Sequence, residues 1–248
     1  MSRHLVYFVS DTHLGLRVGD PARREAAFTD FLRRIDTPET AALYLLGDIW
    51  DFWYEYRDVV PKGFVRVFGA LTALMDHGVQ VCFFRGNHDL WSYRYFEELG
   101  MVPLAQPHVV QLGGLRFCLG HGDGLGPGNH WYKFVKGVFS RRLPQRLFSA
   151  LHPWFAFRLG TGWSRKSRRS KAIAYRFRGS GEPLYRFCED FLADTPVDCF
   201  IFGHYHSPTD LPVGPARLMI LGDWMTAPNW IEFDMDSGRL SARQDYWK

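Results

Sequence analysis

The sequence has few cysteines and no apolar run long enough to cross a membrane. Its 4 cysteines form no CxxC pair and lie in apolar segments, which favours reduced core thiols over disulfides or a thiolate zinc site. No apolar stretch approaches the ~20 residues of a transmembrane helix. The first residues lead straight into a strand-like run, without the pattern of a signal peptide. We therefore expect a cytoplasmic protein.

Acidic residues are absent from a long internal stretch. Residues 124–181 contain no Asp or Glu but 13 Lys and Arg. The net charge of +4 therefore combines this basic stretch with an acidic body, in which 17 Lys and Arg face 26 Asp and Glu. Such an asymmetry predicts an anionic partner for the basic stretch. The length of 248 residues fits one large domain with an insertion rather than two full α/β domains.

The acidic body repeats one pattern, in which a short apolar run ends in a cluster of Gly, Asp, Asn or His. Five runs show it, at residues 5–9, 42–46, 79–84, 115–119 and 199–202. Short continuous apolar runs are typical of buried strands. Apolar side chains at helical spacing occupy residues 64–75 and 184–192. Alternating strands and helices predict an α/β fold, whose sites lie beyond the carboxyl ends of the strands.

Seven side chains of metal-ligand type follow these five runs. Three are oxygen donors and four are imidazoles, namely Asp11, His13, Asp48, Asn87, His121, His204 and His206. This set is too large for one closed zinc site, but it suits two cations that a shared carboxylate holds ~3.5–4 Å apart. Mixed nitrogen and oxygen donors favour Mn²⁺, Fe or Zn²⁺. In Asp-x-His and His-x-His, residues i and i+2 of an extended chain point the same way.

Each cluster taken alone has a simpler explanation. A single His or Asp at a strand end is usually a cap, a turn or a surface residue, and Gly-Asn-His-Asp alone could be a turn. Five clusters that supply seven donors in one chain do not fit that explanation as a set. Asp51 and Asp89 are predicted to orient imidazoles from behind the donors, with capping of the loops as the alternative.

The order D-x-H, G-D-x-x-D, G-N-H-D, H-G-D, G-H-x-H resembles the calcineurin-like metallophosphoesterase superfamily over residues 11–206. The resemblance implies an α/β fold of four layers, α/β/β/α, with a helical cap insertion. It also implies two divalent metal ions that share Asp48 as a bridging ligand. The first ion is then held by Asp11, His13, Asp48 and His206, and the second by Asp48, Asn87, His121 and His204.

This resemblance also implies a reaction. Two cations, for which we expect Mn²⁺, lower the pKa of a bridging water and neutralise phosphate oxygens during in-line attack. His88 is the predicted catalytic residue, because it stands beside the phosphate and can donate a proton to the leaving oxygen or stabilise charge. The alternative for His88 is a ring that only packs beside Asn87.

The basic stretch contains an insert, residues 127–179, between two parts of the predicted core, residues 1–126 and 180–248. Aromatic side chains are interleaved with its cations, and Leu151, Trp154, Phe155, Phe157 and Leu159 lie close together in the sequence. This segment is too apolar for a phosphate track alone and suits acyl chains or a membrane interface. The alternative is a helical cap that packs on its own aromatic side chains.

With this insert, the chain resembles a narrower family, the UDP-2,3-diacylglucosamine pyrophosphatases of lipid A biosynthesis. In that family a serine and the residues four and seven positions later contact the substrate, and here they are Ser164, Arg168 and Lys171. Spacing i, i+4, i+7 places all three on one helical face. The resemblance further implies substrate contacts by Asn87, His88, Asn129 and His204. The best-known branch has arginine in place of His88, glutamate in place of Asp51 and a neutral amide in place of Arg168.

The sequence therefore predicts an enzyme that hydrolyses UDP-2,3-diacylglucosamine to UMP and 2,3-diacylglucosamine 1-phosphate, with water attacking the α-phosphorus. We expect a lipid substrate rather than nucleic acid, and a peripheral position on the inner face of the cytoplasmic membrane. Two other functions stay open at this point. One is a dimetal phosphodiesterase or phosphatase that acts on nucleotides or nucleic acid, and the other is a non-catalytic scaffold on the same fold.

Overall fold

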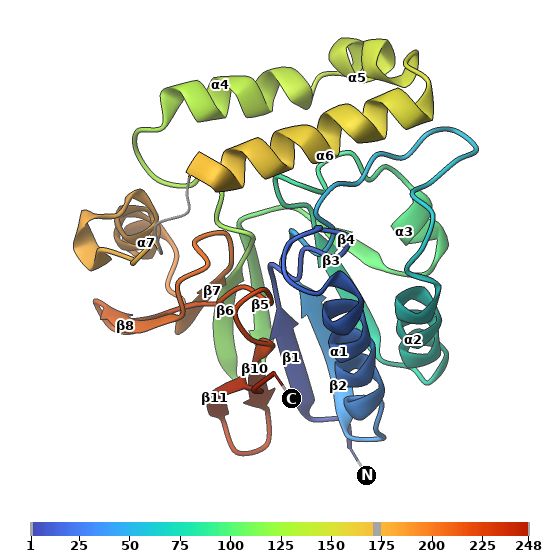
Figure 1. Ribbon diagram of the computed structural model, residues 1–248. Coiled ribbons are helices and arrows are strands. Elements are labelled where there is room, and N and C mark those ends of the chain that lie inside the picture. Colours follow the sequence, from blue (N-terminus) through green and yellow to red (C-terminus); the bar gives the residue numbers. More distant parts are fainter. Residues whose placement is uncertain (1, 171–174, 248) are drawn as a thin grey trace.

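Two β-sheets lie face to face between layers of helices (Figure 1). The computed structural model describes residues 2–170 and 175–247, and for residues 142, 161 and 163–170 it describes the backbone alone. The first sheet has six strands in the order β11-β10-β1-β2-β3-β4. Strands β1 to β4 run parallel, and β10 pairs antiparallel with both β1 and β11. These strands are β1 (Leu5–Val9), β2 (Thr40–Leu45), β3 (Gln80–Phe84), β4 (Val102–Leu104), β10 (Asn229–Asp234) and β11 (Arg239–Gln244).

The second sheet has five strands in the order β5-β6-β7-β9-β8. Strands β6, β7 and β9 run parallel, and β5 and β8 pair antiparallel at the two edges. Gly113 and Gly114 join β5 to β6 with φ values of 50° and 83°, as a two-residue hairpin turn of the primed type requires. The strands are β5 (His108–Leu112), β6 (Leu115–Leu119), β7 (Cys199–Phe202), β8 (Thr209–Val213) and β9 (Ala216–Ile220).

Alternating side chains divide the interior into three layers of apolar contacts. Val6 and Phe8 of β1 belong to the core between the two sheets. Tyr7 and Val9 face the opposite way and pack under helices α1 (Pro21–Arg34) and α2 (Val65–Asp76). Phe200 of β7 packs under helix α7 (Pro183–Asp194) on the far side of the second sheet. The predicted α/β/β/α architecture is therefore confirmed.

The predicted strands are found within one or two residues of their expected bounds, and all four cysteine thiols are buried and free. Helix α1 was not predicted. It begins at a clear signal, because the Asp20 side chain accepts the N–H of Arg23 at 3.0 Å and Pro21 occupies the first turn. The short helices α3 (Tyr95–Glu98) and η1 (Gly179–Gly181) complete the body of the protein.

Three helices of the insert lie across the end of the sheets at which the parallel strands finish (Figure 1). They are α4 (His130–Phe139), α5 (Arg142–Ser149) and α6 (Pro153–Ser170). Side chains of the body hold them from below: the indole of Trp91 donates to the Phe139 carbonyl at 2.9 Å, and the Tyr54 hydroxyl donates to the Gln145 carbonyl at 2.8 Å. None of the helices in the described part of the chain has the length and apolar character that crossing a bilayer requires.

Candidate metal centre

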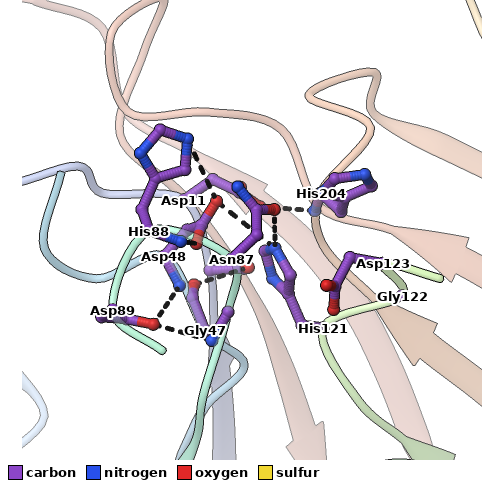
Figure 2. A network of polar contacts seen from close by, with 12 residues as sticks. Asp11, Gly47, Asp48, Asn87, His88, Asp89, His121, Gly122, Asp123 and His204 are labelled. Carbon is purple, nitrogen blue, oxygen red and sulfur yellow. Dashed lines mark hydrogen bonds and ion pairs between the residues drawn. The ribbon is translucent and has the colours of Figure 1, made fainter. Parts of the chain in front are cut away.

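The structure brings all seven predicted donors to one end of the two sheets, in the loops after β1, β2, β3, β6 and β7. Figure 2 shows Asp11, Asp48, Asn87, His121 and His204 among them. The backbone has positive φ, between 44° and 67°, at five of the seven donors, namely Asp11, His13, Asp48, His204 and His206. Non-glycine residues adopt this left-handed region only at a cost, and such conformations gather at functional sites. The surrounding fold therefore holds these loops in a strained conformation that directs their side chains inward.

Asp11, His13 and His206 form a first group of donors, whose ligand atoms lie within 4.8 Å of one another. Nε2 of His206 is 3.1 Å from Oδ1 of Asp11 and 3.4 Å from Nε2 of His13. Within residues 2–170 and 175–247, Oδ1 of Asp11 is buried and accepts no hydrogen bond of good geometry. A buried carboxylate oxygen needs a partner, and a divalent cation between this oxygen and the two imidazoles would supply one.

Asp48, His121 and His204 form a second group within the same limit of 4.8 Å. Nε2 of His121 lies 3.3 Å from Oδ2 of Asp48 and 3.3 Å from Oδ1 of Asn87. The backbone N–H of His204 donates to Oδ2 of Asp11 at 2.9 Å, which ties this group to the first. Figure 2 shows Asp48 and Asn87 directed toward the His121 ring.

Asp48 lies between the two groups. Its Oδ2 atom is 3.3 Å from Nε2 of His121 in the second group and 3.9 Å from Nε2 of His13 in the first. Its Oδ1 atom accepts the backbone N–H of His88 at 2.8 Å, which fixes the orientation of the carboxylate. One carboxylate can therefore reach cations held by either group, as a bridging ligand must.

Hydrogen bonds at Nδ1 direct the imidazoles into the centre. Nδ1 of His121 lies 2.9 Å from the Leu46 carbonyl, so it carries the proton and leaves Nε2 for the centre. Nδ1 of His206 lies 3.2 Å from Oδ2 of Asp223, a carboxylate that was not predicted. Asp223 follows strand β9 in Gly222-Asp223, so the pattern of an apolar run ending in Gly and Asp could have indicated it.

The charges of the centre favour a bound cation. Burial alone would raise the pKa of the Asp11 and Asp48 carboxyl groups, but the nearby imidazoles outweigh it and hold both pKa values well below their usual range. Burial lowers the pKa of His206, yet Asp11 overcomes it and raises that pKa to about 9. Burial and the charge of His121 lower the pKa of His204 to about 3. Ionised carboxylates removed from water require positive partners.

His88 lies at the rim of the centre with its side chain 18% exposed. Its Nδ1 atom is 2.8 Å from the Asp51 carbonyl oxygen, which accepts the Nδ1 proton. The Nε2 atom is then the one that faces the centre, 4.0 Å from Oδ2 of Asp48. The partly exposed His88 side chain therefore presents Nε2 toward the donors.

Asp51 and Asp89 have different positions. Oδ1 of Asp51 lies 3.7 Å from Nδ1 of both His13 and His88, so its charge is close to two imidazoles. The Asp89 carboxylate instead accepts backbone N–H groups, from Gly86 at 2.7 Å and from Ile49 at 2.8 Å. Of the two predicted roles for Asp89, the structure therefore supports capping rather than orientation of an imidazole. Asp89 caps two loops, because its two oxygens satisfy buried N–H donors that have no partner in a strand.

Comparison with known proteins identifies the class of this centre. The family model for calcineurin-like phosphoesterases matches residues 4–208. The chain belongs to the calcineurin-like phosphoesterase family. A UDP-2,3-diacylglucosamine hydrolase of Porphyromonas gingivalis is 37% identical over 98% of this chain and 99% of its own length. A protein of the same name from Yersinia pseudotuberculosis is 29% identical over 94% of this chain and 96% of its own length.

Membership of a dimetal-dependent phosphoesterase family agrees with the donor set. The predicted family and enzyme class are confirmed. The two groups of donors, the orphaned Oδ1 of Asp11 and the shared Asp48 fit two divalent cations. Nitrogen and oxygen donors without thiolate suit Mn²⁺, Fe or Zn²⁺, and the donors alone do not distinguish among these metals.

The structure describes the predicted substrate contacts of the insert to different extents. Asn129 is the residue that precedes helix α4, with φ of 50°. Ser164 and Arg168 lie within helix α6, where the structure describes the backbone alone, and Lys171 lies outside the described residues. Asn87, His88 and His204 lie at the metal centre, and their substrate contacts stay a prediction.

Proposed function

We propose that this phosphoesterase hydrolyses UDP-2,3-diacylglucosamine to UMP and 2,3-diacylglucosamine 1-phosphate, a step of lipid A biosynthesis, with two Mn²⁺ ions. The names of relatives that share 37% and 29% of their residues with this chain over nearly its full length support the substrate. The metal centre supports hydrolysis of a phosphoester of some kind. The choice of a lipid must come from another part of the molecule.

The surface of the insert supports a lipid substrate. Large apolar side chains on α4, α5 and α6 are exposed to solvent, among them Trp131 at 76%, Leu143 at 68% and Trp154 at 60%. A folded protein does not usually leave so many large apolar side chains on one region of its surface without a partner. The same region contains Lys and Arg but no acid. An anionic molecule with apolar chains matches both properties.

The chain's own residues have defined roles in this proposal. Asp11, His13, Asp48 and His206 would hold one cation, and Asp48, Asn87, His121 and His204 would hold the other. When bound, the two cations supply a Lewis acid for the phosphate oxygens and a water of lowered pKa. His88 presents Nε2 toward the centre, while its Nδ1 proton is held by the Asp51 carbonyl. A protonated Nε2 can therefore donate to the leaving oxygen or to the phosphate.

The insert would bind the two ends of the substrate separately. Ser164, Arg168 and Lys171, with Asn129, are proposed to grip the pyrophosphate and glucosamine, since charge-assisted bonds to phosphate are the strong ones. The exposed apolar side chains are proposed to meet the acyl chains. We also propose that residues 127–179 act as a cap on a core of residues 1–126 and 180–248. The cap would rest on the inner face of the cytoplasmic membrane, where anionic lipids attract its cations.

A substrate panel tests the proposed function. The protein, loaded with Mn²⁺, is incubated with UDP-2,3-diacylglucosamine, with UDP-glucosamine that lacks acyl chains, and with DNA, and the release of UMP or nucleotides is measured. We expect kcat/KM to be highest for the acylated substrate. A protein without preference for the acylated over the deacylated substrate contradicts the lipid proposal. Greater activity on DNA would assign the basic insert to nucleic acid.

Variants of the insert separate its two parts. Trp154→Ser and Phe155→Ser remove side chains that are 60% and 52% exposed. We expect kcat/KM to fall for long-chain substrates, because each lost CH₂ contact is worth up to ~0.8 kcal/mol, and to stay normal for a small phosphodiester. Val65→Ser is the matched control, because Val65 is 77% exposed but lies at the start of α2. Equal effects of all three variants would contradict an acyl-binding role.

A further inference from the structure

Helix α6 lies against the loop of the metal centre at Gly160. A Cβ atom placed on Gly160 would lie 2.2 Å from Cε2 and 2.4 Å from Cζ of the Phe52 ring. Real Cβ atoms do not approach other atoms so closely, so the ring lies directly against the helix backbone. Gly160 is buried, and Ala156, one turn earlier, is 0% exposed. Small residues at spacing i, i+4 therefore let this face of α6 approach the body closely.

Phe52 connects the metal centre to the insert. It directly follows Asp51, whose carboxylate lies beside His13 and His88. Its ring is 5.6 Å from the ring of Phe157 in α6, at an interplanar angle of 88°. On the other side it is 6.4 Å from the ring of Trp91 in the body, at 83°. Edge-to-face contacts of this kind fix the position of a ring, so Phe52 has little freedom to move away from the helix.

The segment of α6 after this contact carries two predicted substrate residues. Ser164 and Arg168 follow Gly160 by four and eight residues in the same helix. On the other side of the contact, Asp48 precedes Phe52 by four residues in the loop after β2. The Phe52–Gly160 contact therefore joins the helix proposed to grip the substrate to the loop that holds the proposed bridging ligand.

We infer that Phe52 and Gly160 are positioning residues that set the distance between helix α6 and the metal centre, and thereby select a substrate that spans both. This inference rests on the proposed function, because it assigns a part of the lipid substrate to α6. Neither residue touches the reacting atoms. A side chain at position 160 would push the helix outward, so a long substrate could no longer engage the cap and the metals together. A small diester that needs only the metals would depend much less on this distance.

Two glycine variants in the same helix test the inference. Gly160→Ala adds a methyl group against Phe52, whereas Gly162→Ala adds one at an exposed position where a Cβ would have no described atom within 4 Å. Both variants gain the same helix propensity from the change of Gly to Ala, so they differ only in the contact with Phe52. kcat and KM are measured with Mn²⁺ for UDP-2,3-diacylglucosamine and for bis(p-nitrophenyl) phosphate. We expect Gly160→Ala to lower the ratio of lipid to diester activity by about tenfold or more, since misplacement by ~1 Å can cost ~10²-fold. Gly162→Ala should keep the wild-type ratio.

Rescue distinguishes positioning from general damage. Phe52→Ala removes the ring atoms Cε2, Cζ and Cδ2, which would lie 2.2 to 2.6 Å from the new methyl group. The double variant Phe52→Ala/Gly160→Ala should therefore recover most of the wild-type ratio, with Phe52→Ala alone as its reference. A Gly160→Ala protein with the wild-type ratio, an equal loss on both substrates, or a folded double variant without recovery would overturn the inference. If Gly160→Ala does not fold, the double variant carries the test, and its failure to fold would overturn the inference too.

The wild-type protein separates the two proposals. Wild-type protein that releases no UMP from the acylated substrate refutes the proposed function. Wild-type protein that is active, while Gly160→Ala and Gly162→Ala behave alike, refutes only the positioning role of Phe52 and Gly160.

Discussion

Replacement of Asp48 by asparagine tests the bridging role directly, because it changes one charge and almost no shape. The asparagine oxygen can still accept the His88 N–H that Oδ1 of Asp48 accepts at 2.8 Å, so we expect the fold to survive. The amide NH₂ group would then replace Oδ2, which lies 3.3 Å from Nε2 of His121 and 3.9 Å from Nε2 of His13. The change removes a negative charge from both groups of donors at once.

The magnitude follows from these distances. Unit charges ~4 Å apart interact by on the order of 4 kcal/mol at an effective dielectric constant of about 20. Loss of even ~2.7 kcal/mol of transition-state stabilisation lowers the rate ~10²-fold. We therefore expect Asp48→Asn to reduce kcat at least ~10²-fold, and to reduce the number of metal ions bound per chain.

The assay combines turnover with metal content. The variant is freed of metal, reloaded with Mn²⁺ and passed through a desalting column, and bound metal is measured by mass spectrometry beside the rate of UMP release. Asp58→Asn is the control, because it changes the charge equally at a side chain that is 86% exposed. An Asp48→Asn protein with two metal ions per chain and a kcat close to that of Asp58→Asn would remove Asp48 from the bridge.

Three further results are expected. His88→Ala should lower kcat by ~10²–10⁴-fold with little change in KM, as loss of a general acid does, and a normal kcat would leave His88 no role in the chemical step. Chelation with EDTA should abolish UMP release and lower the unfolding temperature, since a ligand at 100 times its Kd adds ~2.7 kcal/mol to the stability of the folded state. If Mn²⁺ does not raise the unfolding temperature again, the result argues against a metal centre. Burial raises the pKa of Glu182, but Arg178 and Tyr175 outweigh it and lower that pKa below 4.5. The ionised carboxylate therefore stabilises the fold above pH 4.5, and this contribution is lost as the pH falls through the lowered pKa. Glu182→Gln should therefore unfold a few degrees below the wild type at neutral pH and converge with it in acid, and equal unfolding temperatures at neutral pH would contradict this.

The donors of the metal centre could be predicted because each one follows an apolar run. Strands such as β1 and β7 are buried on both faces, so their sequences are continuous apolar segments with sharp ends. In each sheet the ends of the parallel strands lie at one edge. The two sheets pack face to face with these edges at the same end, which places Asp11 after β1 beside His204 after β7 of the other sheet. The fold class and the donor set thus depend on local patterns that a single sequence contains.

Other features depend on which strands are neighbours, and no local pattern encodes that. The run that ends in Gly222-Asp223 marks Asp223 as a site residue, but its pairing with His206 depends on β9 lying beside β7 in the second sheet. The contact between Phe52 and Gly160 likewise depends on how α6 crosses the body. The sequence left two roles open for Asp89, and the arrangement of the loops decides between them, since its carboxylate accepts backbone N–H groups of two loops.

The position of β1 in the first sheet has a consequence for synthesis on the ribosome. β1 pairs on one side with β2, which emerges soon after it, and on the other side with β10, which spans Asn229–Asp234. A growing chain therefore carries β1 with one edge unpaired until nearly the whole sequence has left the ribosome, and open strand edges promote association between chains. The Asp11 carboxylate likewise gains the hydrogen bond from the His204 N–H only after residue 204 has been synthesised. We expect chains terminated before residue 229 to aggregate, and the metal centre to be among the last parts of the protein to form.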